Sequence, residues 1–193
     1  GARSERRNKS VNAQTGTTSH YPMAPAAARA ESHPLTVLVD NEPGVLARVI
    51  GLFSGRGYNI DSLTVSETEH EAHLSRITIV TSGPPMVIEQ IKNQLDRLVP
   101  IHSVTDLTLL GNPVERELAL VKVAGKGEKR VEALRLAEAF RASVIDASTE
   151  HFIFEITGKQ SKIEQFIVLM QPLGLVEVSR TGLAAISRGA ERM

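Results

Sequence analysis

A short polar turn between two apolar segments has the residue types best suited to holding a small charged molecule. Residues 40–44, Asp-Asn-Glu-Pro-Gly, precede a segment whose apolar residues have the spacing of one helix face. Asp40 or Asn41 can cap that helix, and Pro43 and Gly44 are expected in its first turn with a helical backbone. Glycine there costs stability relative to alanine, but it lets another molecule approach the backbone. The free amides and the helix dipole can then hold a carboxylate, although an ordinary capped helix is the simpler interpretation.

The elements that must position this turn follow from apolar periodicity, which divides the chain into two similar halves. In the first half we predict strands at residues 35–39, 58–65, 74–80 and 104–110, helices at 43–56 and around 87–98, and a polar turn at 67–73. In the second half we predict strands at residues 117–123, 143–147, 152–157 and 175–178, helices around 131–140 and 163–170, and an extension of the last strand at 183–186. Both halves therefore have the order βαββαβ.

This order predicts an α+β protein made of two ferredoxin-like βαββαβ domains. Right-handed crossovers turn it into one antiparallel sheet with two helices on one face. The predicted boundaries are an arm at 1–32, a first domain at 33–110, a linker at 111–116 and a second domain at 117–189. Sheets left uncovered by such a fold need partners, so we expect two copies to pair.

Asn59 is the second polar residue of interest, because it begins a predicted strand directly after Gly57 and Tyr58. In a ferredoxin-like half, this point lies beside the amino end of the first helix of a neighbouring sheet when two sheets join edge to edge. The asparagine side chain has both a donor and an acceptor, so it can serve an ammonium or a carboxylate. An asparagine that closes a turn after glycine is the simpler interpretation.

Other candidate sites are weaker. His70 and His73 are spaced for a shared metal on a helix, but they fall in a predicted turn without a third ligand, so we expect a solvated pair. Residues 125–129 lack the glycine spacing and the Lys-Ser/Thr end of a phosphate loop, so we expect a turn. Phe152 and Phe154 share one strand face, where aromatic residues of an RNA-binding module would stack on bases. We expect them in the core instead, because their neighbours are acidic.

Composition narrows the function further. The 193 residues contain 22 Lys and Arg and 22 Asp and Glu, which argues against a general nucleic-acid binder. The absence of cysteine excludes disulfides, thiolate nucleophiles and thiolate zinc sites. No apolar run approaches the ~20 residues of a membrane span. Residues 1–32, rich in Arg, Ser, Thr and Ala, predict a disordered arm of a cytoplasmic protein, or an organellar targeting segment.

Two stretches, residues 38–49 and 52–65, together closely resemble the regulatory small subunit of acetohydroxyacid synthase, also called acetolactate synthase. The resemblance continues through residues 75–80, 115–123 and 180–189 and covers the chain after the arm. The first stretch alone would indicate only an ACT domain, the module of a family of amino-acid sensors. The combined set is specific to the small subunit.

The resemblance implies an N-terminal ACT domain, a C-terminal ferredoxin-like domain and a homodimer under feedback control by a branched-chain amino acid, usually valine. The family's ligand lies where two ACT domains meet. The resemblance places on it Asn41, Gly44, Val45 and Leu46 of one chain, with Asn59 and Ile60 of the other. In this arrangement helix amides take the carboxylate, asparagines take the ammonium, and the aliphatic side chains form an apolar seat.

The resemblance also implies that this chain is not an enzyme by itself and holds no metal or cofactor. Thiamine diphosphate, magnesium and FAD are expected in the catalytic large subunit, which condenses pyruvate with pyruvate or 2-oxobutyrate. A free-standing ACT-type sensor that controls another enzyme or a transcription factor is the alternative. No DNA-reading helix is evident, and the second half matches the small subunit.

Overall fold

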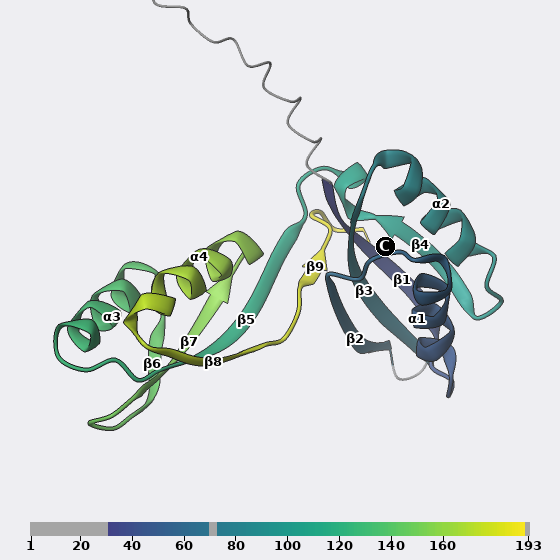
Figure 1. The fold of residues 1–193 in the computed structure, drawn as a ribbon. Coiled ribbons are helices and arrows are strands. Elements are labelled where there is room, and N and C mark those ends of the chain that lie inside the picture. The colour runs from purple at the N-terminus through teal and green to yellow at the C-terminus, as the bar shows by residue number, and fades with distance from the viewer. Residues whose placement is uncertain (1–30, 70–72, 192–193) are drawn as a thin grey trace, which may run out of the picture.

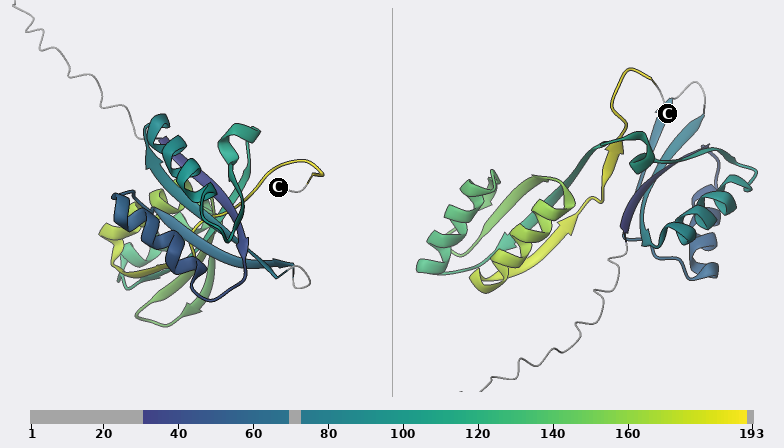
Figure 2. Two further views of the ribbon diagram at one scale, coloured as in Figure 1. Left: turned by 90° about the vertical axis from the view of Figure 1, so that its right-hand side faces the viewer. Right: turned by 90° about the horizontal axis from the view of Figure 1, so that it is seen from above.

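The computed structural model describes residues 31–69 and 73–191, which form two halves of similar architecture (Figure 1). We call residues 31–110 the N-terminal half and residues 114–186 the C-terminal half. Each half has an antiparallel sheet with two helices on one face, which confirms the predicted fold class. Two further views in Figure 2 show each half as a separate body with its own sheet and helices.

The N-terminal half has the strand order β2-β3-β1-β4, with β2 and β4 at the edges. Its elements are β1 (Glu31–Asp40), α1 (Val45–Arg56), β2 (Ser62–Glu69), β3 (Leu74–Gly83), α2 (Pro85–Asp96), β4 (Ile101–Asp106) and the 3-10 helix η1 (Leu107–Leu110). Alternate residues of β1 and β3 pack against one stripe of each helix, because strands have a period of two and helices of 3.6. This core includes Leu35, Val37, Ile77, Ile79, Val49, Phe53, Ile91 and Leu95, all fully buried or nearly so.

The C-terminal half repeats the plan with the strand order β6-β7-β5-β8. Its elements are β5 (Val114–Val123), α3 (Glu128–Ala139), β6 (Ser143–Ala147), β7 (Phe152–Gly158), α4 (Gln160–Met170), the 3-10 helix η2 (Gln171–Leu173), β8 (Leu175–Arg180) and β9 (Ala184–Ile186). Phe154 and Phe166 meet edge to face, with ring centroids 6.0 Å apart. They lie in a core formed by β5, β7 and the apolar stripes of α3 and α4.

Several element bounds differ from the predicted ones around α1 and β2. Strand β2 begins at Ser62 rather than at residue 58, because residues 58–61 carry the chain from the end of α1 to the sheet. Within this link the Tyr58 amide donates to the Phe53 carbonyl at 2.9 Å, and the two rings meet edge to face. Strand β2 also continues into the predicted turn as far as Glu69. His70 lies outside the described residues.

Strand bounds elsewhere are also wider or shifted. Strand β1 begins at Glu31, inside the predicted arm, and pairs along its whole length with β3, whereas residues 1–30 lie outside the described part. Strand β4 ends at Asp106, whose carboxylate accepts from the Thr108 amide and starts η1 where more strand was predicted. Strand β5 begins at Val114, inside the predicted linker. In the described residues no helix is long and apolar enough to cross a bilayer.

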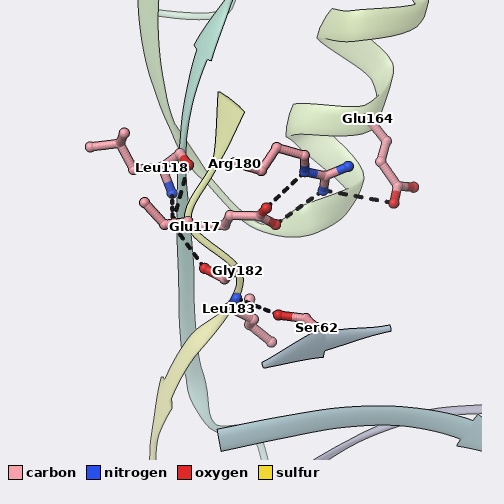
Figure 3. Close-up of polar contacts among 8 residues, drawn as sticks. Ser62, Glu117, Leu118, Glu164, Arg180, Gly182 and Leu183 are labelled. Atoms are coloured by element: carbon pink, nitrogen blue, oxygen red, sulfur yellow. Dashed lines mark hydrogen bonds and ion pairs between the residues drawn. The ribbon is translucent and has the colours of Figure 1, made fainter. Parts of the chain in front are cut away.

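The two halves are joined at a junction where β9 returns to the N-terminal half. We predicted residues 183–186 as an extension of the last strand; instead β9 is separate and pairs with the first residues of β5. The Leu183 amide donates to Ser62 Oγ at 2.8 Å, and Thr64 Oγ1 donates to the Leu183 carbonyl at 3.1 Å. Leu183 is buried, and Figure 3 shows its contact with Ser62 at β2.

Gly182 permits this close approach. Its φ is +86°, and a Cβ at this position would lie 2.9 Å from Ser62 Oγ and 3.0 Å from Thr64 Cγ2. A side chain there would be both strained and crowded against β2.

An ion pair stabilises the same junction on the side of the C-terminal half. Glu117 is buried, and its two carboxylate oxygens accept from Arg180 Nε at 2.7 Å and Nη2 at 3.0 Å (Figure 3). This bidentate hydrogen bonding raises the pKa of Arg180 above its ordinary value. Glu164 of α4 lies 3.9 Å from the same guanidinium.

Candidate functional site

The turn before α1 presents free backbone amides, as the sequence predicts. The Val45 amide makes one long contact, 3.4 Å to the Glu42 carbonyl, and Arg48 makes the first helical hydrogen bond, 3.1 Å to the Gly44 carbonyl. Among the described residues, no acceptor bonds the amides of Gly44, Leu46 or Ala47, and no side chain caps the helix. Unpaired amides at a helix amino end attract an anion, because they add to the positive end of the dipole.

The backbone of Gly44 differs from the prediction. We expected a helical residue in the first turn of α1, but Gly44 is the N-cap and is left-handed, with φ 85° and ψ −8°. The helix therefore begins at Val45 and not at Pro43, and neither Asp40 nor Asn41 caps it. A glycine is favoured here because an L-residue adopts this conformation only at a cost in free energy. The position is exposed, and a Cβ would meet no atom within 4 Å.

The aliphatic side chains of the predicted site face different surroundings. Leu46 is exposed next to the free amides, and Ile60 is half-buried against the N-terminal core. Val45 is buried in that core, so its side chain is not available in the single chain as part of an apolar seat.

Both asparagines of the predicted site use their amide groups as donors within the chain. Asn41 Nδ2 donates to Glu67 Oε1 at 3.2 Å, and Asn59 Nδ2 donates to the Asp61 carboxylate. The Asn59 carbonyl accepts from Thr81 Oγ1 at 2.7 Å, which ties the residue to β3. Each side-chain oxygen Oδ1 is then oriented away from its donor contact, so both asparagines offer acceptors suited to an ammonium.

One chain does not bring the two parts of the predicted site together. Gly44 precedes α1 and Asn59 follows it, and the 12 residues of the helix separate them. At about 1.5 Å per residue, the two ends lie roughly 18 Å apart. A single small ligand can contact both only if the second part comes from another chain.

Asp61 and Glu67 hold the side chains of the two asparagines, a role that the sequence did not predict. Asp61 accepts from Asn59 and from Ser82 Oγ, and Glu67 accepts from Asn41. The position of Asp61, two residues after Asn59, could have indicated its role. The role of Glu67 depends on the pairing of β2 with β3, which no local pattern shows.

The structure also tests the aromatic pair and the glycine-rich turn of the sequence analysis. Phe152 and Phe154 lie in the C-terminal core beneath α3 and α4, and Arg130 stacks on the Phe152 ring at 3.9 Å, so the RNA-stacking alternative is wrong. The turn predicted at residues 125–129 ends at Gly127, because α3 begins at Glu128. Within the described ranges, no group of three or more His, Cys, Asp or Glu side chains could hold a metal ion.

Comparison with protein families matches both halves. The family described as "AHAS small subunit-like ACT domain" matches residues 35–103, and "Small subunit of acetolactate synthase" matches residues 116–189. The chain is 47% identical over 160 residues to a probable acetolactate synthase small subunit of Archaeoglobus fulgidus, covering 83% of this chain and 99% of the relative. It is 44% identical over 160 residues to the isozyme 3 small subunit of Escherichia coli K12, covering 82% and 97%.

A solved structure is also similar. The crystal structure of the acetolactate synthase small subunit from Thermotoga maritima superposes with a TM-score of 0.73 at 43% sequence identity. It covers 83% of this chain and 99% of that chain.

Proposed function

The chain belongs to the family of acetolactate synthase small subunits, and we propose that it is the regulatory subunit that activates the catalytic large subunit and confers feedback inhibition by valine. The observation that carries the sensing role is the exposed turn at Gly44, where three backbone amides have no acceptor in the described residues. An amino acid supplies the carboxylate that such a turn attracts.

The proposed effector site is shared between two chains. One chain gives the free amides around Gly44 and the exposed Leu46, and the other gives Asn59 and Ile60. The roughly 18 Å between the ends of α1 supports this division. The valine carboxylate lies on the amides, its ammonium lies between the Oδ1 atoms of Asn41 and Asn59, and its isopropyl group contacts Leu46 and Ile60.

A homodimer formed through the N-terminal halves follows from the shared site. Strand β2 is an edge strand of its sheet and begins at Ser62, two residues after Ile60. An edge strand with free backbone groups is a natural place for a second sheet to join. Pairing of two β2 edges brings the residues before each strand toward the other subunit.

The chemistry of acetolactate formation is assigned to the large subunit. Thiamine diphosphate, magnesium and FAD are expected there, and this chain contributes activation and the valine response. Reconstitution tests the proposal: acetolactate formation is measured with the large subunit alone, with this chain alone, and with both, at increasing valine. We expect no turnover by this chain alone, a higher rate with both, and inhibition by valine of the pair.

Two results would count against the proposal. Turnover by this chain in the absence of large subunit would make it an enzyme. A chain that binds valine but neither activates the large subunit nor makes it valine-sensitive would instead be a free-standing amino-acid sensor.

A further inference from the structure

A pocket lies at the junction, on the face of the N-terminal sheet opposite its helices. Residues at alternate positions of a strand share one face, and Thr64 and Ser66 of β2 lie beside Arg76 and Thr78 of β3 there. The ladder formed by the start of β5 and β9 passes over this face and borders an open pocket of about 430 Å³. That volume falls within the range of small-molecule sites.

The pocket is positively charged although the chain as a whole is neutral. Two arginines are among its lining residues, Arg76 from the sheet and Arg116 from β5, and no acidic residue is among them. Arg116 Nη1 donates only to the Glu115 carbonyl, at 2.6 Å. Within residues 31–69 and 73–191, no carboxylate pairs with either guanidinium.

One guanidinium nitrogen of Arg76, Nε, has no hydrogen-bond acceptor. Nε itself has almost no accessible surface, so an oxyanion in the pocket would meet this guanidinium at its terminal nitrogens, which bind carboxylates bidentately. Ser66 and Thr78 place hydroxyl groups on the same wall as further donors.

Apart from Arg116, the opposite wall is apolar. Val114, Ala185 and Ile186 line the pocket from the β5–β9 ladder. An anion with a short aliphatic group therefore matches both walls. An ammonium next to the carboxylate does not match, because two positive charges face it and no acid compensates.

We propose that this pocket binds a short-chain aliphatic carboxylate that has no ammonium group. Its carboxylate contacts Arg76 and Arg116, and its hydrocarbon part contacts Val114 and Ile186. The walls come from both halves, so an occupant contacts the N-terminal sheet and the β5–β9 ladder at once. The assignment is independent of the valine site, which lies at the other face of the sheet, at the start of α1.

The test uses a matched pair of probes, 3-methylbutanoate and valine, which share the carboxylate and isopropyl group and differ by the ammonium. The full chain is titrated with each probe, and with inorganic phosphate, at constant ionic strength by amide-resolved NMR. We expect 3-methylbutanoate to bind saturably at one site per chain, with shifts at residues 64–66, 76–78 and 184–186. Valine should leave the signals of residues 76–78 and 184–186 unchanged, whereas residues 64–66 lie on the β2 edge that the proposed dimer pairs and are not used for this comparison.

Variants test whether Arg76 and Arg116 bind the carboxylate. Arg116→Glu should weaken 3-methylbutanoate binding at least tenfold, and Arg76→Gln should do the same. Arg97→Gln removes an exposed charge at the end of α2 and should leave the affinity unchanged. Because Arg116 is exposed, Arg116→Glu should keep the fold even if Arg76→Gln does not.

Three outcomes would overturn the proposal. The first is no saturable binding of 3-methylbutanoate to the wild-type chain. The second is equal affinity in the folded Arg116→Glu variant. The third is a set of signals that valine shifts equally, or that only phosphate shifts, because the pocket would then not select an aliphatic carboxylate.

Discussion

Gly44→Asp and Gly44→Asn together distinguish a carboxylate-binding turn from an ordinary start of a helix. With φ at 85° an L-residue is strained, at a cost of roughly 1–2 kcal/mol, although Asn and Asp accept this conformation more readily than other residues. A Cβ would meet no atom within 4 Å, so no steric term adds to that cost. We expect both variants to fold with a similar, modest loss of stability.

The two variants differ by one charge, so their difference in valine affinity measures repulsion between the introduced carboxylate and that of valine. At about 4 Å this repulsion is about 1 kcal/mol in water and about 4 kcal/mol at an effective dielectric constant of 20. Each 1.4 kcal/mol changes affinity about tenfold. Relative to Gly44→Asn, Gly44→Asp should raise the valine inhibition constant by between about fivefold and about a thousandfold.

Defined heterodimers assembled with the large subunit test whether the site is shared. Asn59→Ala removes an acceptor for the ammonium and should weaken inhibition by about tenfold to a hundredfold. With Gly44→Asp on one chain and Asn59→Ala on the other, both changes fall in one site and the second site stays intact. With both changes on one chain and a wild-type partner, each site carries one damaged residue.

The measurement is the valine affinity and stoichiometry of each heterodimer. Equal values for the two heterodimers would refute the shared site. Loss of activation together with inhibition in Gly44→Asn would show that the turn serves the fold, and the sensing role of Gly44 would then be wrong.

Further predictions concern the folded chain. A chain that starts at Glu31 should keep the melting temperature of the full chain, because the described fold begins there; a drop of many degrees would mean that the arm docks. A fragment ending at Asn112 should still bind valine by titration but melt at a lower temperature, because it loses Leu183 and Ala185 from the covered sheet face; a folded fragment unable to bind valine would contradict the site. Glu117→Gln should lower the free energy of unfolding by about 1–3 kcal/mol in chemical denaturation, whereas exposed Glu164→Gln should change it by less than about 0.5 kcal/mol; equal effects would refute the burial argument.

The sequence was most informative where structure is local. Helical spacing located α2, α3 and α4, and alternation located β3, because the period of a helix or strand depends on residues a few positions apart. The burial of Phe154 was predicted from the acidic residues around it and is confirmed. These elements were enough to predict both βαββαβ halves.

The errors occur where distant residues decide the conformation. Strand β9 has three residues, too few for a periodic signal, and its partner is the start of β5. The left-handed backbone of Gly44 follows from how the turn meets α1, and a glycine in the sequence is compatible with either conformation. The donor role of the Asn41 amide likewise depends on Glu67, which β-pairing brings near.

The contact between Ser62 and Leu183 has a consequence for the order of folding. The two residues are 121 positions apart, so their hydrogen bond closes a very long loop. Closing such a loop loses chain entropy before any contact forms to offset the loss. Each βαββαβ half can instead fold through contacts between residues that are closer in the sequence. We therefore expect the N-terminal sheet to form before this contact, with one face open to solvent. That face is covered only when the segment after β8, among the last described residues to be synthesised, reaches back to it.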